Sequence, residues 1–160
     1  MTEKKLRVGI IFGGRSGEHE VSLASARSVI ANLDQNKYEV VPIGITKDGS
    51  WRLGTDPTSL QAASQGVQLE AGEETGTTTA VTLTGDPSLR RLIPVQSGEQ
   101  LRDNGELDVI FPVLHGTYGE DGALQGLLEM ADVPYVGCGV LGAALGMDKE
   151  KMKMIFQNIG

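Results

Sequence analysis

The chain has 160 residues and a formal net charge of −7, a length that fits one domain of ordinary size. The acidic balance argues against a nucleic-acid partner, because phosphate backbones are bound by concentrated basic surfaces. The single cysteine, Cys138, excludes a disulfide framework, and no apolar stretch reaches the length of a membrane span. We therefore expect a soluble, cytoplasmic protein with no nucleic-acid partner and no membrane partner.

The first part of the chain predicts a strand, a helix and a second strand. Residues 6–12 are almost continuously apolar, as in a strand that is buried on both faces. Ser22 is a suitable N-cap for the helix that follows, whose apolar stripe consists of Ala26, Val29, Ile30 and Leu33. Residues 38–45 form the second apolar run. This order predicts a parallel βαβ unit.

The middle of the chain predicts antiparallel additions to that unit. Asp48-Gly49 favours a hairpin over residues 46–53, in which Trp51 would pack over a sheet edge in a structural role. Residues 54–76 are polar and lack a lasting period, which indicates a mobile surface insertion. Residues 79–84 and 91–95 can pair as a second hairpin, placed at an edge by its proline.

The core resumes at residues 108–114, another buried-strand pattern, and is followed by a helix, a short strand at 133–136 and a small glycine-rich helix. The first of these helices has an apolar face made of Leu124, Leu127, Leu128 and Ala131. Asp148 is a good N-cap for a last helix, whose apolar stripe comprises Met152, Ile155, Phe156 and Ile159. The predicted fold is α/β: a Rossmann-like, mainly parallel sheet with helices on both faces and antiparallel hairpins.

The turn after the first strand is the first candidate binding site. It reads F-G-G-R-S-G-E-H-E-V-S-L over residues 12–23, and its glycines allow a close approach of a ligand to the backbone. Glu18 and Glu20 would repel a phosphate at this helix start and suit a ligand ammonium better. The alternative is that both acids only complement the helix dipole. The residues of this turn leave both interpretations open.

His115 follows the later buried strand, at the same edge of the predicted sheet. Its imidazole could hold a ligand carboxylate or orient a neighbouring acid, whereas a lone loop histidine is more often structural. The coincidence of two polar strand-end loops favours a ligand site if the two strands are neighbours. His19 has no such support and is interpreted as a solvent-facing or supporting residue.

The segment from Gly137 to Gly142 matches the dinucleotide pattern G-x-G-x-x-G. Its preceding strand is short and no acidic strand end follows it, so we interpret its glycines as turn and helix-packing positions. Cys138 has no basic neighbour in sequence that would activate its thiol. Lys149 and the lysines after it form, from pattern alone, a solvated charged face. No spacing typical of metal ligands occurs.

Three segments together resemble a known family. They are residues 12–23, H-G-T-Y-G-E-D-G-A-L-Q-G-L-L-E at 115–129 and P-Y-V-G-C-G-V-L-G-A-A-L-G-M-D-K at 134–149. In this order they are similar to the N-terminal part of a D-alanine–D-alanine ligase, an ATP-grasp enzyme. The resemblance implies an enzyme that joins two D-alanines through an acyl phosphate for peptidoglycan precursor synthesis, with ATP and Mg²⁺, or Mn²⁺ in its place.

The resemblance also implies roles for individual residues. Glu18 and His115 would be the catalytic residues, Glu18 holding the ammonium of the first D-alanine and His115 lying near its carboxylate. Val21 and Ser22 would line the substrate pocket, and Lys149 would approach the ATP phosphates. The metal ligands are expected beyond residue 160, and a homodimer is expected from the family.

For the domains, we expect an N-terminal substrate-binding domain at 1–147 with a variable insert at 54–107, and the start of a central ATP-grasp domain at 148–160. The 160-residue piece alone is then expected to be inactive. Two alternatives are a free-standing amino-acid-binding module and a dinucleotide-binding domain. The sequence does not decide whether the second substrate is D-alanine, D-lactate or D-serine.

Overall fold

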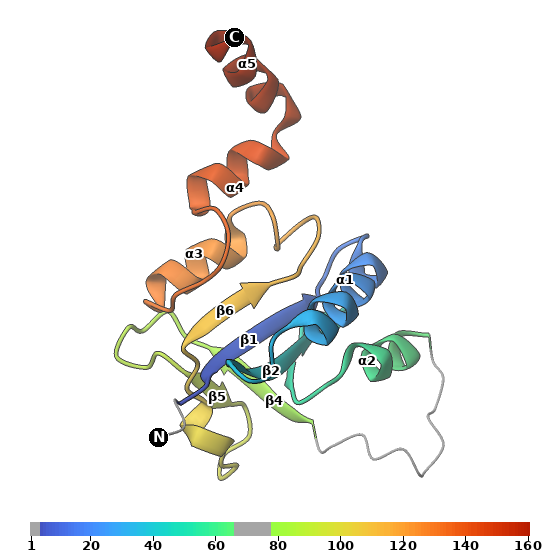
Figure 1. Ribbon diagram of the computed structural model, residues 1–160, viewed down its shortest axis with the longest axis vertical. Helices are drawn as coiled ribbons and strands as arrows, with labels where there is room; N and C mark the ends of the chain where they lie inside the picture. The colour runs from blue at the N-terminus through green and yellow to red at the C-terminus, as the bar shows by residue number, and fades with distance from the viewer. Residues whose placement is uncertain (1–3, 66–77) are drawn as a thin grey trace.

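A six-stranded mixed sheet forms the centre of the molecule (Figure 1). The computed structural model describes residues 4–65 and 78–160. The strands, in the spatial order β5-β4-β3-β2-β1-β6, are β1 (Leu6–Gly13), β2 (Tyr38–Ile45), β3 (Trp51–Leu53), β4 (Thr79–Leu83), β5 (Leu92–Pro94) and β6 (Val109–Pro112). The helices are α1 (His19–Asn32), α2 (Pro57–Ser64), α3 (Ala123–Met130), α4 (Val140–Met147) and α5 (Lys149–Ile159), with a short 3₁₀ helix, η1 (Arg102–Gly105).

The middle strand of the parallel part is β1, which pairs in parallel with β2 on one side and with β6 on the other. This position explains its continuous apolar sequence, because Ile10, Ile11 and Phe12 are all fully buried. The predicted βαβ unit is confirmed. The carboxyl ends of β1 and β6 also lie side by side, so the loops that follow these two strands meet at one edge of the sheet.

Three antiparallel strands extend the sheet beyond β2. The β2–β3 and β4–β5 pairings confirm both predicted hairpins, and β5, which contains Pro94, is an edge strand. The expected position of Trp51 over a sheet edge is wrong. Strand β4 pairs with β3 through Val81 opposite Trp51, so the tryptophan stands inside the sheet and its side chain faces a pocket.

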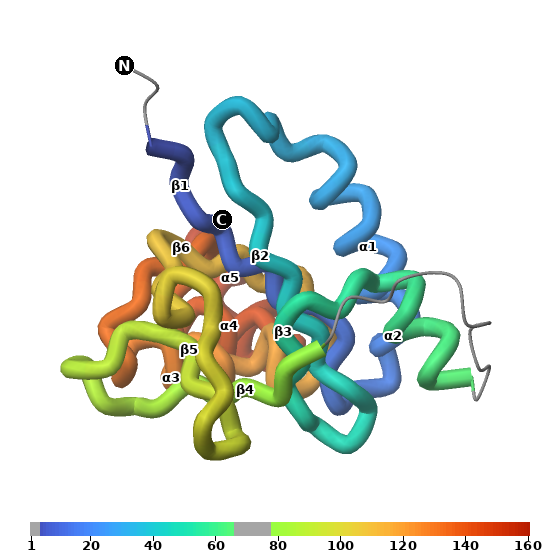
Figure 2. The backbone as a smooth tube through the Cα atoms, turned by 90° about the horizontal axis from the view of Figure 1, so that it is seen from below, coloured from blue at the N-terminus to red at the C-terminus, as the bar shows by residue number. Residues whose placement is uncertain are grey.

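Helices cover both faces of the sheet, as predicted (Figure 2). On one face α1 and α2 pack through Leu23, Ala26 and Leu60 against buried residues of β1. On the other face α3 packs through Leu124 and Leu128 against buried residues of β1, β2, β4, β5 and β6. The apolar stripes predicted for α1 and α3 therefore cover opposite sides of the same sheet.

Two local predictions fail at helix starts. Ser22 is not an N-cap, because α1 begins at His19 and Glu18 occupies the cap position. Helix α2 lies in the stretch expected to be an irregular, mobile insertion. Asp56 caps it by accepting bonds from the backbone N–H groups of Thr58 and Ser59, and Pro57 occupies its first turn. The rest of that prediction, residues 66–76, lies outside the described residues.

The last two helices extend away from the sheet (Figure 1). Asp148 caps α5 as predicted, by accepting a bond from the backbone N–H of Lys151. The predicted apolar stripe of α5 is largely exposed, and Phe156 and Ile159 are 60% and 77% accessible. The expected strand at 133–136 is reduced to one bridge between Tyr135 and Ile110. Among the described helices, none combines the length and apolar character needed to cross a bilayer.

Candidate functional site

The turn after β1 depends on two consecutive glycines. Gly13 and Gly14 have φ angles of +87° and +97°, a region that side chains disfavour. A Cβ atom on Gly13 would lie 2.3 Å from the carbonyl oxygen of Ile45. The Gly14 N–H donates to that same oxygen at 2.8 Å. The chain can therefore turn tightly over the end of β2 only with glycine at these positions.

Ser16 ties this turn to the loop after β6. Its hydroxyl donates to the backbone carbonyl of His115 at 2.7 Å and accepts the N–H of Glu18 at 3.1 Å. One side chain thus connects the backbones of the two residues predicted to be catalytic, although they are almost a hundred positions apart in sequence. The two strand-end loops converge.

The Glu18 side chain lies against the second loop. Its Oε1 atom is 3.4 Å from the position that a Cβ atom would occupy on Gly116, so glycine there leaves room for the carboxylate. Glu18 is exposed, and among the described residues no lysine or arginine forms an ion pair with it. The site therefore presents an unpaired negative charge at the junction of the two loops.

His115 is half-buried in the same junction. Its Nε2 atom lies 3.0 Å from the hydroxyl of Ser25 on α1, which fixes the orientation of the ring. Helix α1 therefore begins next to Glu18 and, two turns later, holds the imidazole of His115. The loops that carry Glu18 and His115 are thus held together at one edge of the sheet.

The two residues expected to line the substrate pocket are placed differently. Val21 is 51% exposed, whereas Ser22 is fully buried. The Ser22 hydroxyl accepts the N–H of Gly13 at 2.8 Å and donates to the carbonyl oxygen of Val113 at 2.5 Å. Ser22 therefore joins the ends of β1 and β6 from beneath, and its hydroxyl is already engaged in two hydrogen bonds.

Glu20 and His19 anchor the start of α1. Glu20 accepts bonds from Lys47 and from Ser64 of α2, each at 3.0 Å. The bond from Lys47 is the largest influence that holds the pKa of Glu20 below its usual range. His19 is 1% exposed, so the expectation that it could face solvent is wrong. Its Nδ1–H donates to the carbonyl oxygen of Gly14 at 2.8 Å.

The structure does not bring Lys149 to this junction. Lys149 begins α5, which lies beyond α4 and away from the sheet edge (Figure 1). In the part of the chain that the structure describes, no group of three or more histidine, cysteine or acidic side chains is arranged to hold a metal ion. These residues alone do not fit a Mg²⁺ site.

The glycines at 137–142 do not form a dinucleotide loop. Only the single bridge at Tyr135 precedes them, rather than a strand, and α4 begins at Val140 with Gly139 in its cap position. A Cβ atom on Gly142 would lie 3.1 Å from that of Cys138. This close packing supports the structural role predicted for Gly142.

Sequence reasoning missed Ser16 and Ser25. A signal for Ser25 was present, because Ser22 and Ser25 are three residues apart and so share one face of α1. Ser16 gave a weaker signal, as a hydroxyl inside a glycine-rich turn. Neither pattern identifies the hydrogen-bond partner of the serine, because in both cases the partner is His115, in the loop after β6.

Together, the sheet and its two joined loops make an α/β domain that offers a small-molecule site at the carboxyl edge of its strands. The family model for the D-ala D-ala ligase N-terminus matches residues 7–138. The chain therefore belongs to the D-alanine–D-alanine ligase N-terminal family.

Individual relatives agree with this assignment. A D-alanine–D-alanine ligase of Rhodococcus opacus (strain B4) is 54% identical over 157 residues, which cover 97% of this chain and 42% of the relative. The crystal structure of the VanG D-Ala:D-Ser ligase from Enterococcus faecalis superimposes with a TM-score of 0.75 at 36% identity, and the match covers 92% of this chain and 40% of that one.

A D-alanine–D-alanine ligase from Bacillus anthracis, solved as a complex with ATP, is 29% identical with a TM-score of 0.56 over 97% of this chain and 36% of that one. The chain thus spans about two-fifths of the length of the curated relatives that it matches.

Proposed function

We propose that this chain is the part of an ATP-dependent D-alanine–D-alanine ligase that recognises the first D-alanine. Glu18 holds the ammonium of this substrate, and His115 lies at its carboxylate, where ATP delivers the phosphoryl group. The amine of a second D-alanine then attacks the acyl phosphate and inorganic phosphate leaves, so that the product is a dipeptide for peptidoglycan precursors. The observation that carries the proposal is the hydrogen-bonded connection through Ser16 of the loops that contain Glu18 and His115.

Electrostatics support these roles. An ammonium needs an anionic partner, and the Glu18 carboxylate is exposed and unpaired among the described residues. A carboxylate that becomes phosphorylated gains from a hydrogen-bond donor that is already oriented, and Ser25 orients the imidazole of His115. Val21 contributes exposed apolar surface beside Glu18. Ser22 acts from beneath, by holding the two strand ends together.

The nucleotide and metal belong to other parts of the proposed enzyme. The relative from Bacillus anthracis was crystallised with ATP, and we propose ATP as the co-substrate here, with Lys149 at its phosphates. When bound, Mg²⁺ would neutralise charge on those phosphates. The described residues contain no cluster that fits this ion. We propose that the ligands of Mg²⁺, or of Mn²⁺ in its place, come from the rest of the full-length enzyme.

The exposed last helix supports a division of the enzyme into domains. We propose that residues 1–147 form the substrate-binding domain, with the variable insert at 54–107, and that residues 148–160 begin the central ATP-grasp domain. The apolar side chains of α5 that are exposed here, such as Phe156, would then be covered by that domain. A cytoplasmic location and a homodimer belong to the same proposal.

The test uses the full-length protein that carries this chain. Glu18→Gln removes the charge that pairs with the ammonium and keeps the size of the side chain. Because a hydrogen bond to a charged group contributes about 1.5–3 kcal/mol, we expect the KM for the first D-alanine to rise roughly tenfold or more. D-alanine-dependent ADP release, measured at saturating ATP, gives both KM and kcat.

Glu99→Gln is the matched control, since Glu99 is exposed and lies in the segment between β5 and η1. Its kinetics should equal those of the unmodified protein. Two results would contradict the proposal: a full-length protein that releases no ADP with D-alanine, or unchanged kinetics in Glu18→Gln. The second result would remove Glu18 from the site and leave the family assignment intact.

A further inference from the structure

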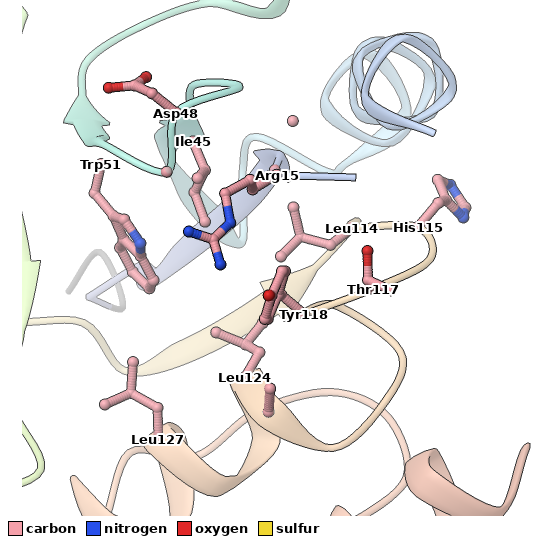
Figure 3. A pocket seen from close by; sticks show the side chains of 14 residues that line it. Arg15, Ile45, Asp48, Trp51, Leu114, His115, Thr117, Tyr118, Leu124 and Leu127 are labelled. Carbon is pink, nitrogen blue, oxygen red and sulfur yellow. The ribbon is translucent and has the colours of Figure 1, made fainter. Parts of the chain in front are cut away.

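A pocket lies beside the turn that follows β1. It has a volume of about 300 Å³ and is enclosed by the turn after β1, the β2–β3 turn and the loop and helix after β6 (Figure 3). Its apolar walls are made by Ile45, Trp51, Leu114, Leu124 and Leu127. Glu18 is not among the lining residues. Pockets of this size, mostly apolar and with few polar groups, commonly hold small molecules.

Among the described residues, Arg15 is the only cationic side chain that lines this pocket. It is exposed, and its guanidinium carbon lies 4.5 Å from the centre of the Tyr118 ring. Figure 3 shows the guanidinium pointing into the space between Trp51 and Tyr118. Within residues 4–65 and 78–160, no carboxylate lies within ion-pair distance of Arg15. The positive charge of Arg15 therefore lies next to apolar pocket walls and has no counter-ion among the described residues.

The one acidic side chain in the pocket lining does not fill this role. Asp48 accepts hydrogen bonds from the hydroxyls of Thr46 and Ser50, and in Figure 3 its carboxylate points away from Arg15. These two bonds also hold the pKa of Asp48 below its usual range, so Asp48 is ionised at neutral pH. A ligand with an ammonium group would gain nothing from Arg15, and a neutral ligand would leave its charge unpaired.

We infer that this pocket binds a small monocarboxylate whose body is a branched or cyclic hydrocarbon. The carboxylate pairs with the guanidinium of Arg15, whose planar fork matches two carboxylate oxygens. The hydrocarbon body packs on Trp51 and on the leucines of α3. A phosphate ester fits less well, because the pocket offers one cation and a largely apolar surface.

This inference goes beyond the proposed function and does not depend on it. The pocket shares Gly14 and His115 with the loops of the D-alanine site. A molecule bound here would thus contact both loops. Its occupancy should therefore be detectable at His115.

The chain contains a built-in reporter, because Trp51 is its single tryptophan and forms a wall of the pocket. The 160-residue chain is titrated with cyclohexanecarboxylate while the fluorescence of Trp51 is recorded. Cyclohexanecarboxamide, which has the same body without the charge, and acetate, which has the charge without the body, are the matched ligands. We expect a saturable change with cyclohexanecarboxylate and an affinity at least about tenfold lower for each control ligand.

Substitutions identify the two contacts. Arg15→Gln should weaken cyclohexanecarboxylate binding about tenfold or more, while Arg27→Gln, an exposed arginine on α1, should leave it unchanged. Leu127→Ala should weaken the binding of the hydrocarbon body while circular dichroism shows the fold intact. If Leu127→Ala unfolds the chain, Arg15→Gln still tests the inference, because Arg15 is exposed.

Three results would overturn the inference: no saturable change in fluorescence, equal binding of the amide, or normal affinity in Arg15→Gln. None of them bears on the proposed ligase, whose kinetics are tested at Glu18. Conversely, if the full-length protein shows no ligase activity, the result expected from this titration stays the same.

Discussion

At the scale of single residues, the candidate site depends on glycines as well as on functional side chains. Gly116 has a φ of +75°, and the carboxylate of Glu18 lies 3.4 Å from the place where its Cβ atom would be. The positive φ therefore favours glycine at this position, directly beside the carboxylate of Glu18. Ser16 then fixes this arrangement through its two bonds to the loop backbones.

Gly116→Ala should consequently lower both stability and substrate affinity. A non-glycine residue in this region of φ costs about 1–3 kcal/mol, and the new methyl group would lie in van der Waals contact with Glu18. We expect a lower urea midpoint for unfolding of the chain and, in the full-length protein, a higher KM for the first D-alanine.

Gly126→Ala is the matched control for that substitution. Gly126 lies within α3, and no heavy atom stands within 4 Å of its added Cβ. Alanine there should raise stability by about 0.5–1 kcal/mol, because it has the higher helix propensity. Equal effects of the two substitutions would show that neither the φ of Gly116 nor its contact with Glu18 matters.

At the scale of elements, α1 positions most of the site. Its first turn lies beside Glu18, its buried Ser22 joins the ends of β1 and β6, and Ser25 holds His115. Glu20 connects the same first turn to Lys47 and to α2. The helix start is therefore tied to three neighbouring segments, which keeps Glu18 in place.

The Glu20 connection should be visible as a pH dependence of stability. Because folding lowers the pKa of Glu20, the ionised form of its carboxyl group stabilises the folded state. The contribution of Glu20 to the free energy of unfolding is fully present when the pH is above its unfolded pKa, near 4.5. This contribution is lost as the pH falls through the lower pKa of the folded state.

Glu20→Gln should thus lower the midpoint of thermal unfolding slightly at pH 7 and have a smaller effect at pH 3. The effect is small because the pair is partly exposed, and such pairs contribute about 0–1 kcal/mol. Lys37→Gln, which removes an exposed i,i+3 pair with Asp34, is the comparison. If the difference in unfolding midpoint between Glu20→Gln and the unmodified chain grows toward pH 3, the stabilising role of ionised Glu20 is contradicted.

At the scale of the whole molecule, the sequence predicts the elements with strong periodicity and misses those that depend on long-range partners. The parallel strands and the stripes of α1 and α3 follow from apolar patterns, and the hairpins follow from turn chemistry. Helix α2 was missed although Asp56-Pro57 is a strong start signal, because its short apolar pattern is hidden in a polar stretch.

The site was predictable only in part for the same reason. Two polar loops at the ends of neighbouring strands indicate that Glu18 and His115 approach each other, since parallel strands bring such loops together. The bonds of Ser16 and Ser25 join segments about 90 to 100 positions apart, and no local pattern specifies them. The pocket around Arg15 likewise needs three separate segments.

The most direct test of the central claim is a double-mutant cycle on the full-length protein, with Glu18→Gln and His115→Gln measured singly and together. The quantity compared is kcat/KM for the first D-alanine, obtained from ADP release at saturating ATP. If both side chains contact one substrate molecule, their effects should be non-additive by about 0.5–3 kcal/mol. Strictly additive effects would show that the acid and the imidazole act independently and would contradict the shared site.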